Sequence, residues 1–336
     1  MKYNLLGRTG LYVSELSLGT MTFGKKTRAM GFDLKAFGEV NQEEANLLVN
    51  KALDSGINFF DSAETYSNGE SEKILGAALE TRRKDVIIAT KVSGRVFSSP
   101  DNTRGLTRKH IIEAVEKSLA RLKTDYIDLY QIHNRDLYTP IEETLRALED
   151  VIRSGKVRYI GCSNLMSWEI MKALGIAAQS AFSRLESVQS YYSIAARELE
   201  REIIPLVADQ QVGLLVWGPL AGGFLTEKAI NGNSDEYARH TQYGPPLVPP
   251  IDRELLTVLY PVLRDIASAY NATVSAVAIA WLLHQQSVTT VLIGVKTMEQ
   301  LVDNIKSVEI RLSKEDLEKL AAASILKPEY PQWLQP

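Results

Sequence analysis

Short apolar runs rich in β-branched and aromatic residues alternate along this chain with stretches in which apolar residues recur every three or four positions. Apolar runs of about four to eight residues bounded by turn residues are typical of buried strands, and a period of about 3.6 residues is typical of amphipathic helices. The runs lie at residues 15–20, 57–61, 86–91, 126–133, 157–164, 185–190, 213–218 and 290–294. The pattern therefore predicts eight strands separated by helices.

Helix start and stop signals fall between these runs. Asn41 with Glu44 has the spacing of a capping box, and Gly56 follows the apolar stripe as a stop signal. Thr139 precedes a second stripe in the same way, with Pro140 at the first helical position. Further helices are predicted over residues 71–80, 107–122, 166–179, 196–209, 273–285 and 297–306.

Alternation of strands and helices predicts a parallel sheet, because parallel strands need crossover connections. Eight such units favour an α/β fold closed as a (β/α)8 TIM barrel over an open doubly wound sheet. The open dinucleotide-binding sheet is the alternative, but no G-x-G-x-x-G follows any predicted strand. A barrel domain spanning residues 1–336 is expected, with its C-terminal mouth bordered by long loops.

Several segments fall outside the repeat. Residues 1–14 contain the turn-like GRTG and predict a β-hairpin ahead of the first barrel strand. Long loops are predicted at residues 24–40, 93–106 and 222–252, and long loops in compact domains usually serve function. The aromatic tail, residues 327–336, is expected either to fold over the barrel mouth or to be disordered.

Composition narrows the class of protein. Hydrophobic content of 45% and charged content of 24% are those of a globular protein with a large core. A net charge of −3 offers no basic surface for nucleic acid or anionic membrane. No apolar run is long enough to span a bilayer, and no secretory leader is recognisable. The single cysteine, Cys162, reads as a small buried hydrophobe and fits a reducing compartment, so cytoplasmic localisation is expected.

Four residues able to carry protons or charge fall at or just after the ends of predicted strands. Asp61 ends the second strand, Lys91 the third and His133 the fourth. Tyr66 follows in the loop after the second strand. Each alone has an ordinary structural explanation, as a turn aspartate, a solvated lysine, a core histidine or a packed aromatic. Their joint placement in one quadrant of a barrel mouth predicts a catalytic site.

The four side chains make chemical sense together. A tyrosine has an ordinary pKa of ~10 and donates protons poorly at neutral pH, but a nearby ammonium lowers that pKa. Lys91 would act on Tyr66 in this way, and Asp61 would keep Lys91 charged. His133 would position a substrate oxygen by hydrogen bonding. Such a site gives a proton to an oxygen that is becoming an alkoxide, so carbonyl reduction fits, with hydride from a nicotinamide cofactor.

These residues lie in segments that together resemble the aldo-keto reductases over nearly the whole chain, closest to the branch that includes potassium-channel β-subunits. The segments are LGRTGLYVSELSLGTMTFG, GINFFDSAETYSNGESEKILGAAL, IIATKV, DYIDLYQIH, GKVRYIGCSN, WGPLAGGFLT and GVKTMEQLVDN. The resemblance implies a barrel reductase that binds NADP(H) across its mouth. It also implies that Asp61, Tyr66, Lys91 and His133 are the catalytic tetrad, with Tyr66 as general acid in reduction.

The resemblance further implies a set of cofactor-binding residues. Ser163, Asn164 and Gln189 match positions that bind the nicotinamide carboxamide, and Trp217 matches an aromatic that stacks on the nicotinamide ring. The other expected contacts are Thr20, Met21 and Asp61 at strand ends, Gly218, Pro219, Leu220 and Gly222 around the pyrophosphate with Lys228 and Arg239 nearby, and Gly294, Lys296, Thr297, Gln300, Asp303 and Asn304 around the adenosine. Lys296 is expected to meet the 2′-phosphate. Gln300 stands where many members have arginine, and with Thr297 it also forms a capping-box pattern.

Three functions are compatible with a barrel of this size. The first is an NADPH-dependent reductase of aldehydes or ketones, including sugar-derived ones. The second is a barrel that holds NADP(H) as a redox sensor and regulates a partner; the intact set of four favours the enzyme. The third, a metal-dependent hydrolase, lacks ligands, because none of the four histidines forms an H-x-H or H-E-x-x-H pair.

The substrate is expected to be a small carbonyl or alcohol, with loop residues setting the choice. Candidate pocket or lid residues are Phe23, Phe32, Phe37, Arg95, Phe97 and Trp333. The sequence leaves the identity of the substrate, the direction of the reaction and the oligomeric state open.

Overall fold

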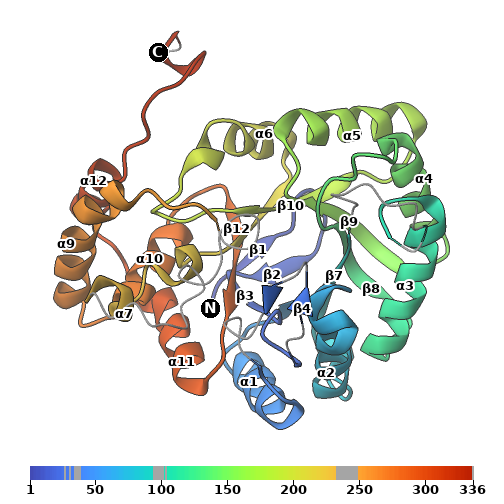
Figure 1. Cartoon of the computed structure of the whole chain (residues 1–336), viewed down its shortest axis with the longest axis horizontal. Helices are drawn as coiled ribbons and strands as arrows, with labels where there is room; N and C mark the ends of the chain where they lie inside the picture. The colour runs from blue at the N-terminus through green and yellow to red at the C-terminus, as the bar shows by residue number, and fades with distance from the viewer. Residues whose placement is uncertain are drawn as a thin grey trace.

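The chain folds into a barrel of parallel strands surrounded by helices (Figure 1). The computed structural model describes residues 1–25, 39–93, 102, 104–231 and 249–334, together with the backbone of two short strands at residues 28–29 and 32–33. The expected contact residue Arg239 and the candidate loop residues Phe37, Arg95 and Phe97 lie outside the described residues.

Eight strands close the barrel, in the order β10-β11-β12-β3-β6-β7-β8-β9. They are β3 (Leu16–Gly19), β6 (Phe59–Asp61), β7 (Ile87–Val92), β8 (Ile127–Ile132), β9 (Val157–Ser163), β10 (Leu185–Tyr191), β11 (Gly213–Trp217) and β12 (Val288–Gly294). All eight neighbouring pairs are parallel. The prediction of a (β/α)8 TIM barrel is confirmed, and each strand begins and ends close to its expected position.

The N-terminal hairpin is also confirmed. It closes the end of the barrel at which the strands begin. Strands β1 (Tyr3–Leu5) and β2 (Tyr12–Ser14) pair antiparallel. Leu6 and Val13 from this hairpin pack with Phe59, Leu129 and other barrel-facing side chains in a small inner core. Gly213 allows the close approach, because a Cβ at that position would lie 2.9 Å from the backbone nitrogen of Gly7. A second, two-residue pair joins β4 (Arg28–Ala29) to β5 (Phe32–Asp33).

Amphipathic helices cover the outside of the barrel and bury the larger core against the outward-facing strand residues. They are α1 (Gln42–Asp54), α2 (Glu70–Ala78), α3 (Arg108–Leu122), α4 (Ile141–Arg153), α5 (Ser167–Ser180), α6 (Ile203–Gln210), α7 (Glu227–Ile230), α9 (Arg253–Ala269), α10 (Val274–Leu283), α11 (Met298–Lys306) and α12 (Lys314–Ala323). Short 3-10 turns lie at η2 (Tyr66–Gly69), η3 (Arg83–Asp85), η4 (Glu198–Glu200), η5 (Ala221–Gly223), η6 (Ser307–Glu309) and η7 (Gln332–Leu334).

Several helix starts follow the predicted capping chemistry, and one does not. Asn41 and Glu44 form the reciprocal capping box of α1, with the Asn41 side chain accepting from the Glu44 N–H. Pro140 is the N-cap of α4 rather than its first helical residue, and no side chain caps that end. The Thr139 hydroxyl donates instead to Asp136, so the predicted capping role of Thr139 is wrong.

Two helices were missed between residues 250 and 325. Asp252 is the N-cap of helix α9, and its carboxylate accepts from the N–H groups of Glu254 and Leu255; the helix continues through Pro261. Helix α12 begins with a capping box between Ser313 and Asp316. Part of the predicted 222–252 loop is also helical, at α7. Among the described residues no single helix is long and apolar enough to cross a membrane, although the bent pair α9 and α10 meets that test jointly on length and composition.

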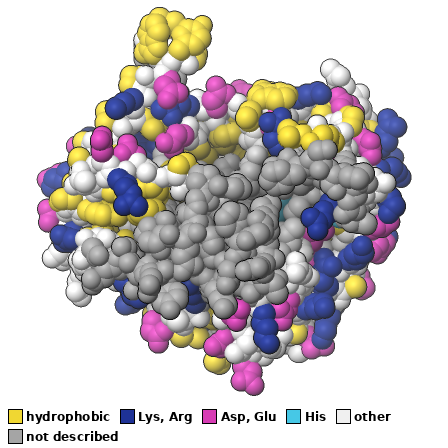
Figure 2. Space-filling view, in the orientation of Figure 1, with side chains coloured by type: hydrophobic (Ala, Val, Ile, Leu, Met, Phe, Trp, Pro, Cys, Tyr) yellow, Lys and Arg dark blue, Asp and Glu magenta, His cyan; other side chains and the backbone are white. Residues whose placement is uncertain are grey.

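The described part of the C-terminal tail extends away from the barrel beyond α12 (Figure 1). Arg201 anchors its base through an ion pair with Glu329. Figure 2 shows an apolar cluster at the end of this projection, where Tyr330, Trp333 and Leu334 are exposed. The described tail residues therefore do not fold over the mouth, and Trp333 is not a lid residue in this conformation.

Candidate active site

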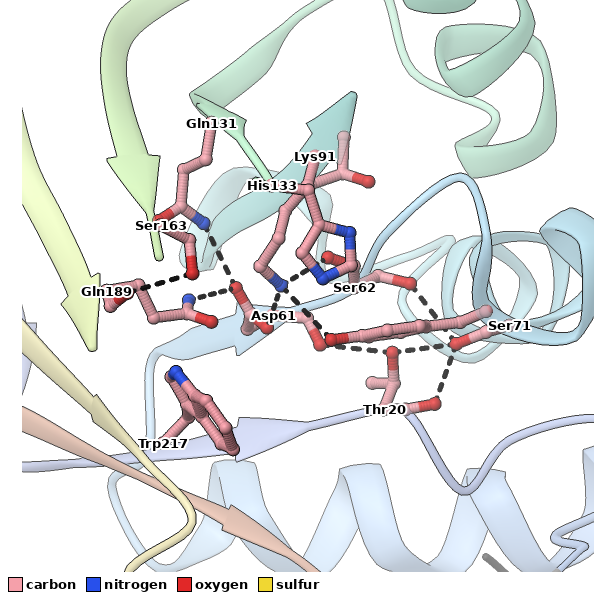
Figure 3. Close-up of polar contacts among 12 residues, drawn as sticks. Thr20, Asp61, Ser62, Ser71, Lys91, Gln131, His133, Ser163, Gln189 and Trp217 are labelled. Carbon is pink, nitrogen blue, oxygen red and sulfur yellow. Dashed lines mark hydrogen bonds and ion pairs between the residues drawn. The ribbon is translucent and has the colours of Figure 1, made fainter. Parts of the chain in front are cut away.

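An ion pair between Lys91 and Asp61 lies at the centre of the candidate site (Figure 3). Strand β6 ends at Asp61 and the neighbouring strand β7 carries Lys91, so both side chains enter the barrel at its C-terminal end. The Lys91 Nζ lies 2.5 Å from Asp61 Oδ2 and also donates to the carbonyl oxygen of Ser62 at 2.8 Å. Both side chains are almost completely buried.

The third bond of the Lys91 ammonium goes to Tyr66. The Nζ lies 3.5 Å from the Tyr66 hydroxyl oxygen, so one buried cation contacts both the carboxylate and the phenol. Burial alone lowers the pKa of Lys91, but the charge of Asp61 and the contacts with Asp61 and Tyr66 outweigh it, and the pKa is raised above 10.5. Lys91 is therefore a permanent cation at neutral pH.

Two glutamines hold the other oxygen of Asp61. Gln131 Nε2 on β8 donates to Asp61 Oδ1 at 3.1 Å, and Gln189 Nε2 on β10 donates to the same atom at 2.8 Å. Three donors thus fix the carboxylate in one orientation, with the ammonium on one side and the amides on the other (Figure 3).

His133 follows β8 and lies beside Tyr66. The two rings meet edge to face, with 5.7 Å between their centroids. Burial, together with the positive charge of Lys91, lowers the pKa of His133 to about 3. The imidazole is therefore neutral at physiological pH and can present a hydrogen-bond donor without a charge.

The loop that carries Tyr66 is held in an unusual conformation. Ser67, Asn68 and Gly69 all have left-handed backbone angles, which non-glycine residues adopt rarely. The Ser67 hydroxyl donates to the carbonyl oxygen of Phe23, and this bond ties the turn to the first loop of the barrel. Predicted site residues Asp61, Tyr66, Lys91 and His133 are thus brought together by rigid elements.

The residues expected near the nicotinamide lie across the mouth from the ion pair. Asn164 has a left-handed backbone and accepts a hydrogen bond from the Trp217 indole N–H at 3.1 Å, while its amide donates to the carbonyl oxygen of His133. The Ser163 hydroxyl donates to the carbonyl oxygen of Gln189 at 2.8 Å. Because the Gln189 amide is bonded to Asp61, its Oε1 is the side-chain atom left to accept from a ligand.

The Trp217 ring packs against Tyr191, the last residue of β10. Its ring lies 5.0 Å from the Tyr191 ring at an interplanar angle of 35°. Gly218 follows in a left-handed conformation, and a Cβ there would lie 2.8 Å from Tyr191 Cδ2. Only glycine at this position leaves room for the Tyr191 ring.

The expected phosphate and adenosine contacts lie at the ends of neighbouring strands. Gly218, Pro219, Leu220 and Gly222 form a tight turn after β11, and Lys228 lies on α7. Gly294 ends β12, and Lys296, Thr297 and Gln300 are exposed at the start of α11. Thr297 caps α11, but Gln300 accepts from the Lys296 N–H rather than from the N-cap, so the reciprocal capping box is not formed.

The remaining expected cofactor residues have structural contacts of their own. Asp303 accepts from the Thr273 hydroxyl at 2.7 Å and thereby ties α11 to the start of α10, and Asn304 is buried. Thr20 is buried and donates to the carbonyl oxygen of Asp61, whereas Met21 is half-buried at the mouth. Asp303 therefore holds one helix against another, and Thr20 holds the backbone at the end of β6.

Several residues of the site were not anticipated. Gln131 lies two positions before His133, and Ser93 lies two positions after Lys91. Alternation along a strand places each on the same face as its partner, so this signal was available. Ser71 was also missed; it bridges Thr20 and Ser62 through its hydroxyl. Cys162 is buried as predicted, and burial raises the pKa of its thiol to about 12.

A dinucleotide fits the chemistry of these side chains. The Gln189 and Asn164 amides, the Trp217 ring, a glycine turn and the exposed Lys296 follow one another along adjacent strand ends, in the order that a carboxamide, a flat ring, phosphates and a further phosphate would require. Among the described residues, no group of three His, Cys, Asp or Glu side chains is placed to hold a metal ion.

Comparisons with known proteins agree with the fold and the motifs. The chain is 38% identical over 330 residues to "Uncharacterized oxidoreductase YrpG" of Bacillus subtilis, which covers 95% of both chains. It is 35% identical to "Versiconal hemiacetal acetate reductase" of Aspergillus parasiticus over 98% of this chain and 99% of that protein. It is also 35% identical to a "Probable voltage-gated potassium channel subunit beta" of Oryza sativa over 98% of both.

A model of one protein family matches almost the entire chain. The match runs from residue 15 to residue 325, from the first barrel strand to just past α12, and its description is "Aldo/keto reductase family". The eight-stranded barrel and the relatives lead to the same assignment. The chain belongs to the aldo/keto reductase family.

Proposed function

We propose that the protein is an NADPH-dependent reductase of aldehyde or ketone carbonyls, with Tyr66 as the proton donor. Aldo/keto reductases are oxidoreductases that generally use NAD(P)H, so family membership supports redox chemistry in general. The observation that carries the finer proposal is the Lys91 ammonium, which contacts Asp61 and Tyr66 at once. The relatives named as reductase and aryl-alcohol dehydrogenase support chemistry between carbonyl and alcohol groups.

The side chains of the site divide the work. A bound nicotinamide would supply the hydride that no side chain can provide. Tyr66 gives its hydroxyl proton to the carbonyl oxygen as negative charge develops there, and Lys91 stabilises the phenolate that remains. His133 donates a hydrogen bond to the same oxygen. Asp61 does not contact the substrate; it keeps Lys91 charged and in place.

The residues that would hold the cofactor extend along the strand ends. Asn164 and Gln189 would bind the carboxamide, Trp217 would cover one face of the ring, and the turn after β11 would meet the phosphates. Lys296 would pair with the 2′-phosphate and favour NADPH over NADH. The substrate would be a small carbonyl or alcohol. The lone Cys162 fits a cytoplasmic enzyme.

The test is NADPH consumption with a panel of aldehydes, ketones and sugars, measured beside Tyr66→Phe. The variant keeps the ring but loses the acid, so kcat should decrease by about 10²–10⁴-fold while the NADPH dissociation constant is unchanged. Tyr12→Phe is the matched control, because Tyr12 lies on the hairpin at the opposite end of the barrel. Equal turnover by the parent and Tyr66→Phe would remove Tyr66 as the acid.

A second candidate function is a redox-sensing regulatory subunit. The relatives named as potassium channel β subunits, each about a third identical to this chain, favour it. This function predicts tight NADPH binding with no turnover of any carbonyl by the parent protein. Failure of both proteins to bind NADPH would instead show that the cofactor assignment is wrong.

A further inference from the structure

His133 is linked to the loop of Tyr66 by a chain of hydrogen bonds that runs behind the catalytic residues. The Ser93 hydroxyl oxygen lies 3.2 Å from His133 Nδ1. The Ser93 backbone N–H donates to Glu64 Oε1 at 2.8 Å, and the Glu64 backbone N–H donates to the carbonyl oxygen of Lys91. Glu64 lies between Asp61 and Tyr66 in the sequence, so it joins the tyrosine loop to the end of strand β7.

The hydrogen bonds of Glu64 fix the position of Ser93 relative to the His133 imidazole. Two bonds between Glu64 and the Lys91–Ser93 segment, one in each direction, hold the strand end against the loop. The Glu64 side chain is only 14% exposed, and its other oxygen lies 3.8 Å from His110 Nε2 on α3. The His110 ring in turn is held by the carbonyl oxygen of Gly105. The Ser93 backbone is therefore held in place where its hydroxyl contacts His133.

The neutral imidazole of His133 carries one proton, and the reaction requires it on a particular nitrogen. If Nδ1 carried the proton, Nε2 would be an acceptor and would repel an oxygen that is gaining negative charge. If Nδ1 accepts a hydrogen bond, Nε2 carries the proton and becomes a donor. Within the described part of the chain, Nε2 makes no hydrogen bond to the protein, so it is available to a ligand.

In the part of the chain that the structure describes, the Ser93 hydroxyl has one partner. Among the described residues, His133 Nδ1 is the one acceptor within hydrogen-bond distance of the Ser93 hydroxyl. The reverse arrangement, with Nδ1–H donating to Ser93, would leave the Ser93 O–H without an acceptor among these residues. The arrangement with Ser93 as donor is therefore the one that pairs this hydroxyl proton with a described residue.

We propose that Ser93 is a positioning residue, whose hydroxyl donates to Nδ1 of His133 and holds the ring as the Nε2–H tautomer. This proposal rests on the proposed carbonyl reduction and identifies what orients its second hydrogen-bond donor. Ser93 acts through His133 and does not contact the substrate. Glu64 supports the arrangement by holding the Ser93 backbone.

The direct test is ¹⁵N NMR of the imidazole side chains in the full-length protein, with and without NADPH, at neutral pH. The long-range ¹H–¹⁵N pattern shows which ring nitrogen is protonated, and His133→Gln identifies the His133 signals. The parent should show Nε2 protonated and Nδ1 unprotonated. Ser93→Ala should give averaged ¹⁵N shifts from mixed tautomers, and Ser93→Thr, which keeps a hydroxyl, should restore the parent pattern.

The second test is the catalytic activity of the Ser93 variants. Ser93→Ala should lower kcat about tenfold, the loss expected for one hydrogen bond, with an unchanged dissociation constant for NADPH. Ser93→Thr should recover most of that loss. Ser154→Ala is the control, because it removes the hydroxyl of an exposed serine at the end of α4, far from the mouth, and should change neither the tautomer pattern nor kcat.

Two results would overturn the proposal: a parent protein with Nδ1 protonated, or a Ser93→Ala variant with the same tautomer pattern as the parent. The failure of the proposed function looks different. In that case the parent turns over no carbonyl at all, while the NMR pattern still shows whether Ser93 sets the tautomer.

Discussion

Lys91 and Asp61 form a buried ion pair in which every proton of the ammonium and both oxygens of the carboxylate are engaged. The ammonium donates to Asp61, to the Ser62 carbonyl oxygen and to Tyr66, and the carboxylate also accepts from Gln131 and Gln189. A buried pair with all its hydrogen bonds made is stable, whereas either partner alone would be an uncompensated charge. The pair is thus a condition for the site to exist as well as for its chemistry.

Removing one partner of this pair should destabilise the fold. Asp61→Asn and Lys91→Met should each lower the free energy of unfolding in urea by about 3–5 kcal/mol. The double variant should lose less than the sum of the two, because no charge is then left unpaired. Strictly additive losses would show that the two side chains are not energetically coupled.

The same pair gives a pH dependence with a definite sign. The pKa of Lys91 is raised in the folded protein, so the folded state binds this proton more tightly than the unfolded chain does. The contribution to stability is therefore complete below the ordinary pKa of 10.5 and is lost as pH rises through the folded value. Urea unfolding of Lys91→Met should lack this alkaline loss.

The sequence predicted the barrel because its signals are local. Each strand appears as an apolar run, each run ends at a turn, and the residues at those ends must meet at one mouth once the sheet closes. Asp61, Lys91 and His133 could be placed together on this basis alone. Helix α9 was missed although Asp252 caps it, because Pro261 lies within its apolar pattern and a proline there usually signals the end of a helix.

Side-chain hydrogen bonds across the barrel could not be predicted from the sequence, for a physical reason. Strands β6 and β10 stand on opposite sides of the closed ring, so the bond between Gln189 and Asp61 depends on the diameter of the barrel and on rotamers. The bond from Ser93 to His133 depends on the register between β7 and β8. Strand alternation shows that such residues face inward but does not show which partner each will meet.

Gly218 should not tolerate a side chain. Its φ of +69° costs an L-residue ~1–2 kcal/mol, and a Cβ would also collide with the Tyr191 ring that supports Trp217. Gly218→Ala should therefore destabilise the protein and weaken NADPH binding. Gly223→Ala is the control: its φ is +106°, but nothing lies within 4 Å of the added Cβ, so it reports backbone strain without the collision. If both variants bind NADPH equally, the Tyr191 contact does not support the cofactor site.

Lys296 should set the preference between the two nicotinamide cofactors. It lies exposed at the start of α11, where a cation can reach a phosphate on the ribose. Lys296→Met should raise the dissociation constant of NADPH about tenfold and leave that of NADH within about twofold. Fluorescence titration with both cofactors measures the ratio. Equal weakening of NADPH and NADH would mean that Lys296 contacts a part that the two molecules share.

The low pKa of His133 should make the fold sensitive to acid. In the unfolded chain a histidine binds a proton as pH falls through about 6.5, but in the folded protein burial and the Lys91 charge lower the His133 pKa to about 3. The unfolded state therefore binds more protons between these values, and the folded state loses stability as pH decreases from 6.5 toward 3. His133→Gln has no such proton to bind, so its unfolding free energy should decrease less over the same range. Urea unfolding of both proteins from pH 8 to pH 4 tests this, since the curves should differ by a constant at pH 7–8 and converge or cross below pH 6. Parallel curves throughout would show that His133 has the same pKa in the folded and unfolded protein, and the low pKa assigned to the folded state would have to be abandoned.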